Sequence, residues 1–442
     1  MNSATMTDAT RALRDRQEET QEIVNIRDKV YVAVAYDTSY MSMIVGDDGI
    51  VIVDSGERPQ AAAGIMERFR AITDKPLKAL LFTHSHWDHV NGAPGVIGSE
   101  KARGNRAFID VWGRENFGSE ARLGELLPDV FRRRGAWQFG VGLPPDKRTK
   151  PLGPKVLPDA GEGRPVSRGP IRVNRRFAGD MMSLELAGVR LELYAAPGET
   201  SDQMFIWLPG ERIAFAGDTI YGSFPNLYAV RGAGYRDVDA WARSVALIRD
   251  KRPEVLIMGH TRPIQDPALC AEWLDSYHDA IRYVFDETIA GMNRGLSADE
   301  LAESVRLPAH LAEKPWLAEF YGNVAWSVRS IFNGHLGWFD GDARRLAPLP
   351  LADEAARMVD MAGGEDAALE RARSALARPA PRSGPDRDAA WAAQLASYVL
   401  RLRPDHPGAR AVSAEALERL GEATLSTSGR NYLLCAARAM RD

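Results

Sequence analysis

Short apolar runs alternate with polar, turn-forming segments along the first 260 residues, a pattern that is typical of a mixed α/β protein. Runs at residues 30–35, 41–45 and 49–54 are separated by turn residues and predict three strands that open a sheet. Residues 79–83, Ala-Leu-Leu-Phe-Thr, have the continuous apolar character of a strand buried on both faces. Further strands are expected at residues 189–195, 212–216 and 255–260.

The pattern changes to helical spacing in the second half of the chain. Apolar residues recur at helical spacing within residues 271–285, so residues 266–335 are interpreted as helices. After Pro348-Leu-Pro350 the composition becomes rich in Ala, Arg and Leu. No clear repeat period supports a peptide-binding helical array there. Helical runs are expected at residues 353–378, 387–403, 407–422 and 428–440, between Pro-rich or Gly-containing breaks.

Two segments of the sequence fall outside the regular succession of strands and helices. Residues 1–25 are polar and form an extension, and residues 99–180 form an insertion with mixed aromatic and basic residues followed by a Pro/Gly-rich stretch. We expect the insertion to cover the functional cleft as a lid, with Trp137 and Phe139 as candidate contacts for the organic part of a substrate. The alternative is a separate packing module.

Four residues of metal-binding type follow the strand at 79–83 within six positions: His84, His86, Asp88 and His89. In an extended chain alternate side chains point the same way, so both imidazoles of His84 and His86 aim at one point. Asp88 and His89 lie where the chain turns and would bind a second ion. Zinc suits imidazole and carboxylate together, and a pair of ions can clamp both ends of a displacement reaction. A chance surface loop is disfavoured, because the whole chain has only eight His.

This His-x-His-x-Asp-His motif resembles the signature of the metallo-β-lactamase superfamily, whose fold is an αββα sandwich of two sheets flanked by helices. The resemblance implies further ligands at the ends of later strands. Glu199 follows Pro197-Gly198, where most members have His. Asp218 matches the bridging carboxylate of the superfamily, and His260 matches its last ligand.

A Glu at position 199 is similar to the alkylsulfatase branch of the superfamily. That branch implies two Zn²⁺ per subunit, with Asp218 and a water or hydroxide between them. The segment Asn226-Leu-Tyr-Ala-Val-Arg231-Gly also matches, which implies that Asn226 and Arg231 hold the sulfate group. Asp54 matches an acidic residue that would orient a metal ligand without binding metal itself. The implied ligands are His84, His86 and Glu199 for one ion, and Asp88, His89 and His260 for the other.

The C-terminal helical region resembles the alkylsulfatase dimerisation domain, a small helical array that pairs two subunits. The resulting prediction is an α/β protein: an αββα metallo-β-lactamase sandwich followed by a smaller all-α domain. The catalytic domain would span residues 26–345 and the dimerisation domain residues 351–442. The expected partner is a second copy of the chain, in a homodimer.

The resemblance implies zinc-dependent hydrolysis of a sulfate monoester, alkyl or small organic, to alcohol and inorganic sulfate. Two divalent ions, three carboxylates and a hydroxide bring the site close to neutrality, so a singly charged ester should be favoured over a phosphate monoester. The expected catalytic residues are Asp218, Arg231 and His335, with His335 as a possible proton donor to the leaving oxygen. His335 stands where the family usually has Tyr, and its alternative role is packing at a domain junction.

Three other functions compete with this interpretation. A flavo-diiron oxygen reductase would favour Glu in place of His86 and would need a flavin module, and the sequence shows neither. A hydrolase of the same fold could act on a lactone or another carbonyl ester, although Glu199 and the pair of Asn226 and Arg231 are unexpected for it. A non-enzymatic scaffold would carry a structural metal, but structural zinc sites are normally closed by four protein ligands.

Charge and composition narrow the partners and the compartment. A net charge of −4 and an isoelectric point of about 6.1 argue against nucleic acid as the main partner. Cys270 and Cys435 are the only cysteines and are far apart in sequence, which suits a reducing compartment. No run of eighteen apolar residues predicts a membrane span, and the polar N-terminus lacks the apolar core of a signal peptide. The sequence therefore predicts a cytoplasmic protein.

Overall fold

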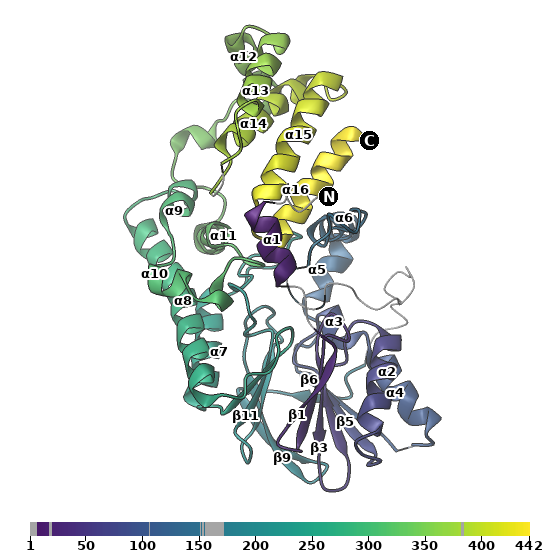
Figure 1. Cartoon of the computed structure of the whole chain (residues 1–442). Helices are drawn as coiled ribbons and strands as arrows, with labels where there is room; N and C mark the ends of the chain where they lie inside the picture. Colours follow the sequence, from purple (N-terminus) through teal and green to yellow (C-terminus); the bar gives the residue numbers. More distant parts are fainter. Residues whose placement is uncertain are drawn as a thin grey trace.

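A computed structural model of the chain describes residues 7–16, 20–105, 107–150, 152, 154, 172–381 and 384–442. Two β-sheets pack face to face, helices cover the outer face of each sheet, and a helical array extends beyond the sandwich (Figure 1). This arrangement confirms the predicted αββα sandwich followed by an all-α region.

The first sheet contains seven strands, which lie side by side in chain order. Its first four strands form an antiparallel meander, and from β4 onward neighbouring strands run parallel. The carboxyl end of β5 therefore lies at the same edge of the sheet as the carboxyl end of β4. The strands are β1 (Glu22–Ile26), β2 (Val30–Val34), β3 (Met41–Val45), β4 (Ile50–Val53), β5 (Leu77–Leu81), β6 (Asp110–Arg114) and β7 (Arg175–Phe177).

The second sheet contains five strands in the order β12-β11-β10-β9-β8. Only β11 and β12 run parallel to each other, so the two chain segments that leave their carboxyl ends lie side by side. The strands are β8 (Met181–Leu186), β9 (Val189–Ala195), β10 (Met204–Leu208), β11 (Ile213–Gly217) and β12 (Val255–Met258).

Three apolar layers hold the sandwich together. Between the sheets, Leu81 of the first sheet and Phe215 of the second belong to one buried cluster. Helices α2 (Pro59–Arg70) and α4 (Ala93–Ala102) cover the outer face of the first sheet. Helices α7 (Val238–Asp250) and α8 (Pro267–Asn293) cover the outer face of the second. Strands with both faces buried read as continuous apolar runs, which is why the sequence pattern located them.

The insertion at residues 99–180 is only partly an addition to the sandwich. Strands β6 and β7 fall within it and extend the first sheet, whereas α5 (Ala121–Leu126) and α6 (Pro128–Gln138) lie outside the sheets. Strand β6 alternates buried and half-buried positions and contains a Gly, and β7 has only three residues. Such short, half-buried strands carry a weak sequence signal. Residues 155–171 of the expected lid lie outside the described residues.

The C-terminal array differs from the prediction at one point. Residues 353–378 form two helices, because Gly363 and Gly364 adopt φ values of 93° and 101° and turn the chain. The array packs around its own buried cluster of small apolar residues. No described helix is long and apolar enough to cross a membrane. The helices after α8 are α9 (Ala298–Ser304), α10 (Ala309–Ala312), α11 (Val324–Leu336), α12 (Leu351–Ala362), α13 (Glu365–Leu376), α14 (Arg387–Leu402), α15 (Pro407–Ala423) and α16 (Thr427–Arg441).

The polar N-terminal extension contains helix α1 (Asp8–Asp15), which lies against α15 and α16 (Figure 1). The Thr10 hydroxyl donates to the Glu422 carboxylate at 2.9 Å. Lys147 of the insertion and Arg430 of α16 donate to the same carboxylate at 2.7 Å and 2.8 Å. Although burial favours the neutral form of Glu422, these cations lower its pKa to about 2. Glu422 thus joins the N-terminal helix, the insertion and the C-terminal array.

Replacement of Glu422 by Gln should destabilise the protein near neutral pH by about 2 kcal/mol, because hydrogen bonds to a charged group are lost. The folded-state pKa lies below the ordinary value of 4.5, so this stabilisation is complete above 4.5 and is lost as the pH falls toward 2. Thermal unfolding followed by circular dichroism at about pH 7 and about pH 3.5 should show a smaller difference from wild type at the lower pH. The exposed Glu303 of α9, replaced by Gln, serves as the control; an equal loss for E422Q at both pH values would contradict the assignment.

Candidate metal centre

The edge of the first sheet presents four predicted metal ligands in one short segment. The chain leaves β5 at Leu81 and reaches His84, which is fully buried, after two residues. His86 is the N-cap residue of the one-turn helix α3 (Trp87–Val90), which carries Asp88 and His89. The early turn into α3 brings all four side chains to the carboxyl end of β5.

The second sheet supplies two more ligands from neighbouring strand ends. Asp218 directly follows β11, and His260 follows β12 by two residues. Between them, the Gly259 amide donates to the Gly217 carbonyl at 2.9 Å. A Cβ atom on Gly259 would lie 2.3 Å from Asp218 Oδ1 and 2.7 Å from His89 Cε1, so this close approach requires glycine.

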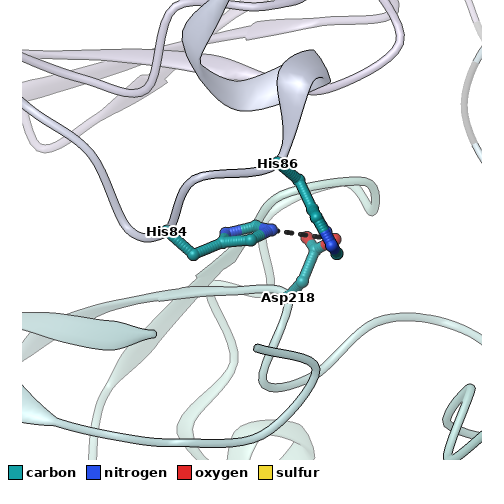
Figure 2. A group of neighbouring side chains, drawn as sticks. All are labelled: His84, His86 and Asp218. Atoms are coloured by element: carbon teal, nitrogen blue, oxygen red, sulfur yellow. Dashed lines mark ion pairs between the residues drawn. The ribbon is translucent and has the colours of Figure 1, made fainter. Parts of the chain in front are cut away.

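These side chains form two adjacent groups. His84, His86 and Asp218 point toward one another (Figure 2), and their ligand atoms lie within 4.8 Å of one another. The ligand atoms of Asp88, His89 and His260 also lie within 4.8 Å of one another. Within the first group, His84 Nε2 lies 3.9 Å from Asp218 Oδ2.

Asp218 lies between the two groups. Its Oδ1 is 3.3 Å from His89 Nε2 and its Oδ2 is 3.1 Å from His260 Nε2, although both histidines belong to the second group. Asp218 therefore occupies a position from which one carboxylate can contact both groups.

The donor set fits divalent metal ions. His84 Nε2, Asp218 Oδ1 and Glu199 Oε2 are buried and have no hydrogen-bond partner among the described residues. Buried polar atoms normally have partners, and His84 and Asp218 belong to one candidate ligand group, so their unpartnered atoms indicate that this group can bind an ion. The mixture of imidazole nitrogen and carboxylate oxygen is the set that borderline divalent ions such as zinc prefer.

Outer contacts aim the imidazoles at the centre. Asp54 Oδ2 lies 2.8 Å from His89 Nδ1, and its carboxylate also accepts from the Thr83 amide at 2.8 Å and the Thr83 hydroxyl at 2.9 Å. The Nδ1 of His260 donates to the Thr38 carbonyl at 2.9 Å. Each contact fixes one ring nitrogen and leaves Nε2 facing inward, as outer contacts do at metal sites.

The charges of the centre are strongly coupled. Burial opposes protonation of His89 and His260, but Asp218 and its neighbouring carboxylates outweigh it, so the pKa of His89 is raised well above its ordinary value and that of His260 is raised to about 10. Burial would raise the pKa of Asp218, yet the two imidazoliums hold it well below its ordinary range. Burial together with the charges of His89 and His86 lowers the pKa of His84. Cations that bind here would replace protons on the imidazoles.

Glu199 stands outside both groups. It follows β9, and its Oε1 pairs with Arg236 Nη1 at 2.8 Å, with both side chains almost completely buried. Arg236 also donates to the Asn226 carbonyl. The sequence pattern did not single out Arg236, five residues after Arg231. No periodic pattern reveals which arginine of a loop is buried.

A candidate anion-binding region adjoins His86. Arg231 Nη2 lies 3.4 Å from His86 Nε2, and Glu120 Oε2 lies 3.8 Å from the same nitrogen. Asn226 is buried, and its amide Nδ2 has no hydrogen-bond partner among the described residues. Burial raises the pKa of Glu120, but contact with His86 and two nearby arginines lowers it. Glu120 lies in the insertion just before α5, and nothing in the sequence distinguished it from the other acidic residues there.

Three further residues were predicted to contact the substrate or to act in catalysis: His335, Trp137 and Phe139. His335 is exposed near the end of α11, with its ring centroid 5.7 Å from that of Tyr235. Trp137 packs against Tyr432 of α16 at 5.1 Å, and Phe139 is 40% exposed. In the described part of the chain, no recorded contact joins His335, Trp137 or Phe139 to a predicted metal ligand.

Comparisons with known proteins agree with this geometry. The metallo-beta-lactamase superfamily model matches residues 36–104 and 129–260, and the alkyl sulfatase dimerisation model matches residues 297–442. The chain is 33% identical over 398 residues to a linear primary-alkylsulfatase of Pseudomonas sp. (strain ATCC 19151), covering 89% of this chain and 72% of that protein. It is 28% identical over 434 residues to an alkyl/aryl-sulfatase of Saccharomyces cerevisiae, covering 95% of this chain and 64% of that protein.

A solved structure is also similar to this chain over its whole length. The stereoselective inverting sec-alkylsulfatase from Pseudomonas sp. superposes with a TM-score of 0.83 at 26% identity, covering all of this chain and 69% of that one. An (R)-specific secondary-alkylsulfatase of Pseudomonas sp. is 28% identical over 432 residues, covering 95% of this chain and 62% of that protein. The chain is therefore shorter than each of these relatives.

Replacement of Asp54 by Asn should weaken divalent-ion binding by about 10–100-fold, the usual effect of losing an outer partner of a metal-binding His. The loss arises because the amide no longer provides a charged partner for His89. Competition with a chromogenic chelator measures the affinity. Glu100, a buried carboxylate that pairs with Arg70 away from the centre, is the matched control as Glu100→Gln. Equal affinities for D54N and wild type would show that Asp54 does not support the metal site.

Proposed function

Because this chain belongs to the alkylsulfatase family of the metallo-β-lactamase superfamily, we propose that it hydrolyses a sulfate monoester, alkyl or small organic, to an alcohol and inorganic sulfate with the help of two zinc ions. The observation that carries the proposal is the position of Arg231, whose guanidinium lies 3.4 Å from His86 at the edge of the metal-ligand groups. A guanidinium held beside a metal centre can donate paired hydrogen bonds to a tetrahedral oxyanion such as sulfate.

The proposed ligands are the residues of the two groups together with Glu199. His84, His86 and Glu199 would hold one ion, and Asp88, His89 and His260 the other, with Asp218 between them. Support for Glu199 is its unpartnered Oε2, since only Oε1 is engaged by Arg236. Zinc bound there would supply a water of lowered pKa and neutralise charge on the ester.

The residues around the ligands would bind the sulfate group. The planar guanidinium of Arg231 can donate two parallel hydrogen bonds to sulfate oxygens. The buried Asn226 amide has an available donor for a third oxygen. His335 stays the proposed proton donor to the leaving oxygen. Its ring packs on Tyr235, which adjoins Arg236.

The charge balance supports a singly charged substrate. Two divalent ions would bring four positive charges, and Asp88, Glu199 and Asp218 bring three negative ones, so a bound hydroxide would bring the core close to neutral. Arg231 would then meet the single negative charge of a sulfate monoester. A doubly charged phosphate monoester would leave one negative charge unmatched.

The zinc-loaded protein should release sulfate from alkyl or aryl sulfates and should turn over phosphate monoesters and lactones at least about 100-fold more slowly in kcat/KM, a difference of nearly 3 kcal/mol. The panel contains short and long alkyl sulfates, an aryl sulfate, a phosphate monoester and a lactone. His84→Ala should abolish sulfate release, and metal analysis should give two zinc ions per wild-type chain. The surface variant Glu303→Gln, purified and loaded with zinc in the same way, is the control for effects of the preparation itself.

Metal-dependent turnover of the lactone alone would instead identify a carbonyl ester hydrolase and remove the proposed roles of Asn226 and Arg231. Comparable kcat/KM values for sulfate and phosphate monoesters would contradict the charge argument.

We further propose that two copies of the chain pair through the helical domain. The match of residues 297–442 to the dimerisation model supports this pairing. Several large apolar side chains of that region are exposed in the single chain, including Trp338, Leu346 and Met361 at 69%, 63% and 79%.

Light scattering of the purified protein should therefore give twice the mass of one chain. Trp338→Ser combined with Leu346→Ser should shift the protein toward monomer, because large apolar residues contribute much of an interface's free energy. A monomeric wild-type protein at micromolar concentration would contradict dimerisation.

A further inference from the structure

Arg231 is held by a buried amide of the insertion. The backbone amide of Arg231 donates to the side-chain Oε1 of Gln138, the last residue of α6, at 2.8 Å. Gln138 is 1% exposed, and its Nε2 has no hydrogen-bond partner among the described residues. Burying a half-satisfied amide is unfavourable, and an apolar side chain of similar size would avoid that cost. Among the described residues, the contact with Arg231 is the side-chain interaction that explains an amide at this position.

The last helix of the chain holds Gln138 in turn. Asn431 of α16 is fully buried, and its Nδ2 donates to the Gln138 carbonyl at 3.2 Å and to the Thr149 carbonyl at 3.0 Å. Its Oδ1 accepts from the Thr149 hydroxyl at 3.4 Å. A Cβ atom on Gly140, where φ is 64°, would lie 3.0 Å from Asn431 Cγ. The chain after α6 therefore wraps closely around the Asn431 amide.

Other contacts join the same elements. Arg134 of α6 donates to the carbonyl of Val230, the residue before Arg231, at 2.5 Å. Three residues further along α6, Trp137 packs against Tyr432 of α16. Helix α6 thus meets both the Arg231 loop and the C-terminal helix.

We propose that Gln138 and Asn431 are positioning residues that fix Arg231 beside the metal centre, so that α16 of the helical domain is part of the catalytic unit. The relay runs from the Asn431 amide through the backbone and side chain of Gln138 to the backbone of Arg231. This role rests on the proposed function of Arg231 in sulfate binding. The helical domain therefore does more than pair subunits, because its last helix sets the geometry of the anion-binding loop.

Gln138→Met tests the relay, because Met fills a similar volume but cannot accept a hydrogen bond from the backbone amide of Arg231. In the zinc-loaded full-length protein, we expect KM for an alkyl sulfate and the dissociation constant for inorganic sulfate, from calorimetry, both to rise about tenfold or more. Zinc content and the thermal midpoint should stay at the wild-type values. Asn431→Ala acts on the same relay from α16 and should change both constants in the same direction. Gln394→Met, on the exposed face of α14, is the matched control and should leave both unchanged.

A double-mutant cycle distinguishes positioning from a general effect on the fold. In an Arg231→Ala background, Gln138→Met should cause no further loss of sulfate binding, because the group that it positions is already absent. A full additional loss in that background, or unchanged KM and sulfate affinity in Gln138→Met alone, would overturn the relay while leaving the proposed function intact. Wild-type sulfate binding and turnover in Arg231→Ala alone would overturn the proposed function itself.

Discussion

The packing of the two sheets against each other is the constraint on which the rest of this protein depends. One sheet carries the ligands that follow β5, and the other carries those that follow β11 and β12. Leu81, three residues before His84, and Phe215, three residues before Asp218, are buried in the layer between the sheets. Asp218 reaches His89 and His84 across that boundary. Because interiors are close-packed, a displacement of one sheet would separate carboxylate from imidazole and divide the centre.

The centre also shows how a fold accommodates many buried charges. Each buried carboxylate faces a cation: Asp54 faces His89, Glu199 faces Arg236, and Asp218 faces two imidazoles. Isolated charges in such a place would be very costly, whereas paired ones are tolerated. The pairs therefore make a metal site possible before any ion arrives, because imidazolium protons balance the acidic groups until divalent ions replace them.

The features that could be predicted from the sequence are those that depend on residues close together in the chain. The ligands after β5 are local, and their strand is a continuous apolar run, so the His84–His89 segment could be recognised, and its resemblance to the superfamily signature implied the sandwich. Glu120, Arg236 and Gln138 could not, because their importance comes from contacts with residues far away in sequence. The split of residues 353–378 was missed although its cause, two consecutive glycines, is visible. Strands β6 and β7 were missed because they are short and incompletely buried.

Helix α1 and its main anchor lie at opposite ends of the described chain. Thr10 and Glu422 are 412 residues apart in sequence. A ribosome that adds roughly 5–20 residues per second needs about 20–80 s to cover that interval. During this time the sandwich can already have formed, while α1 still lacks the surface on which it docks. Attachment of α1 is thus a late event in biosynthesis, and its protection from proteases should mark chains whose C-terminal helices have already folded.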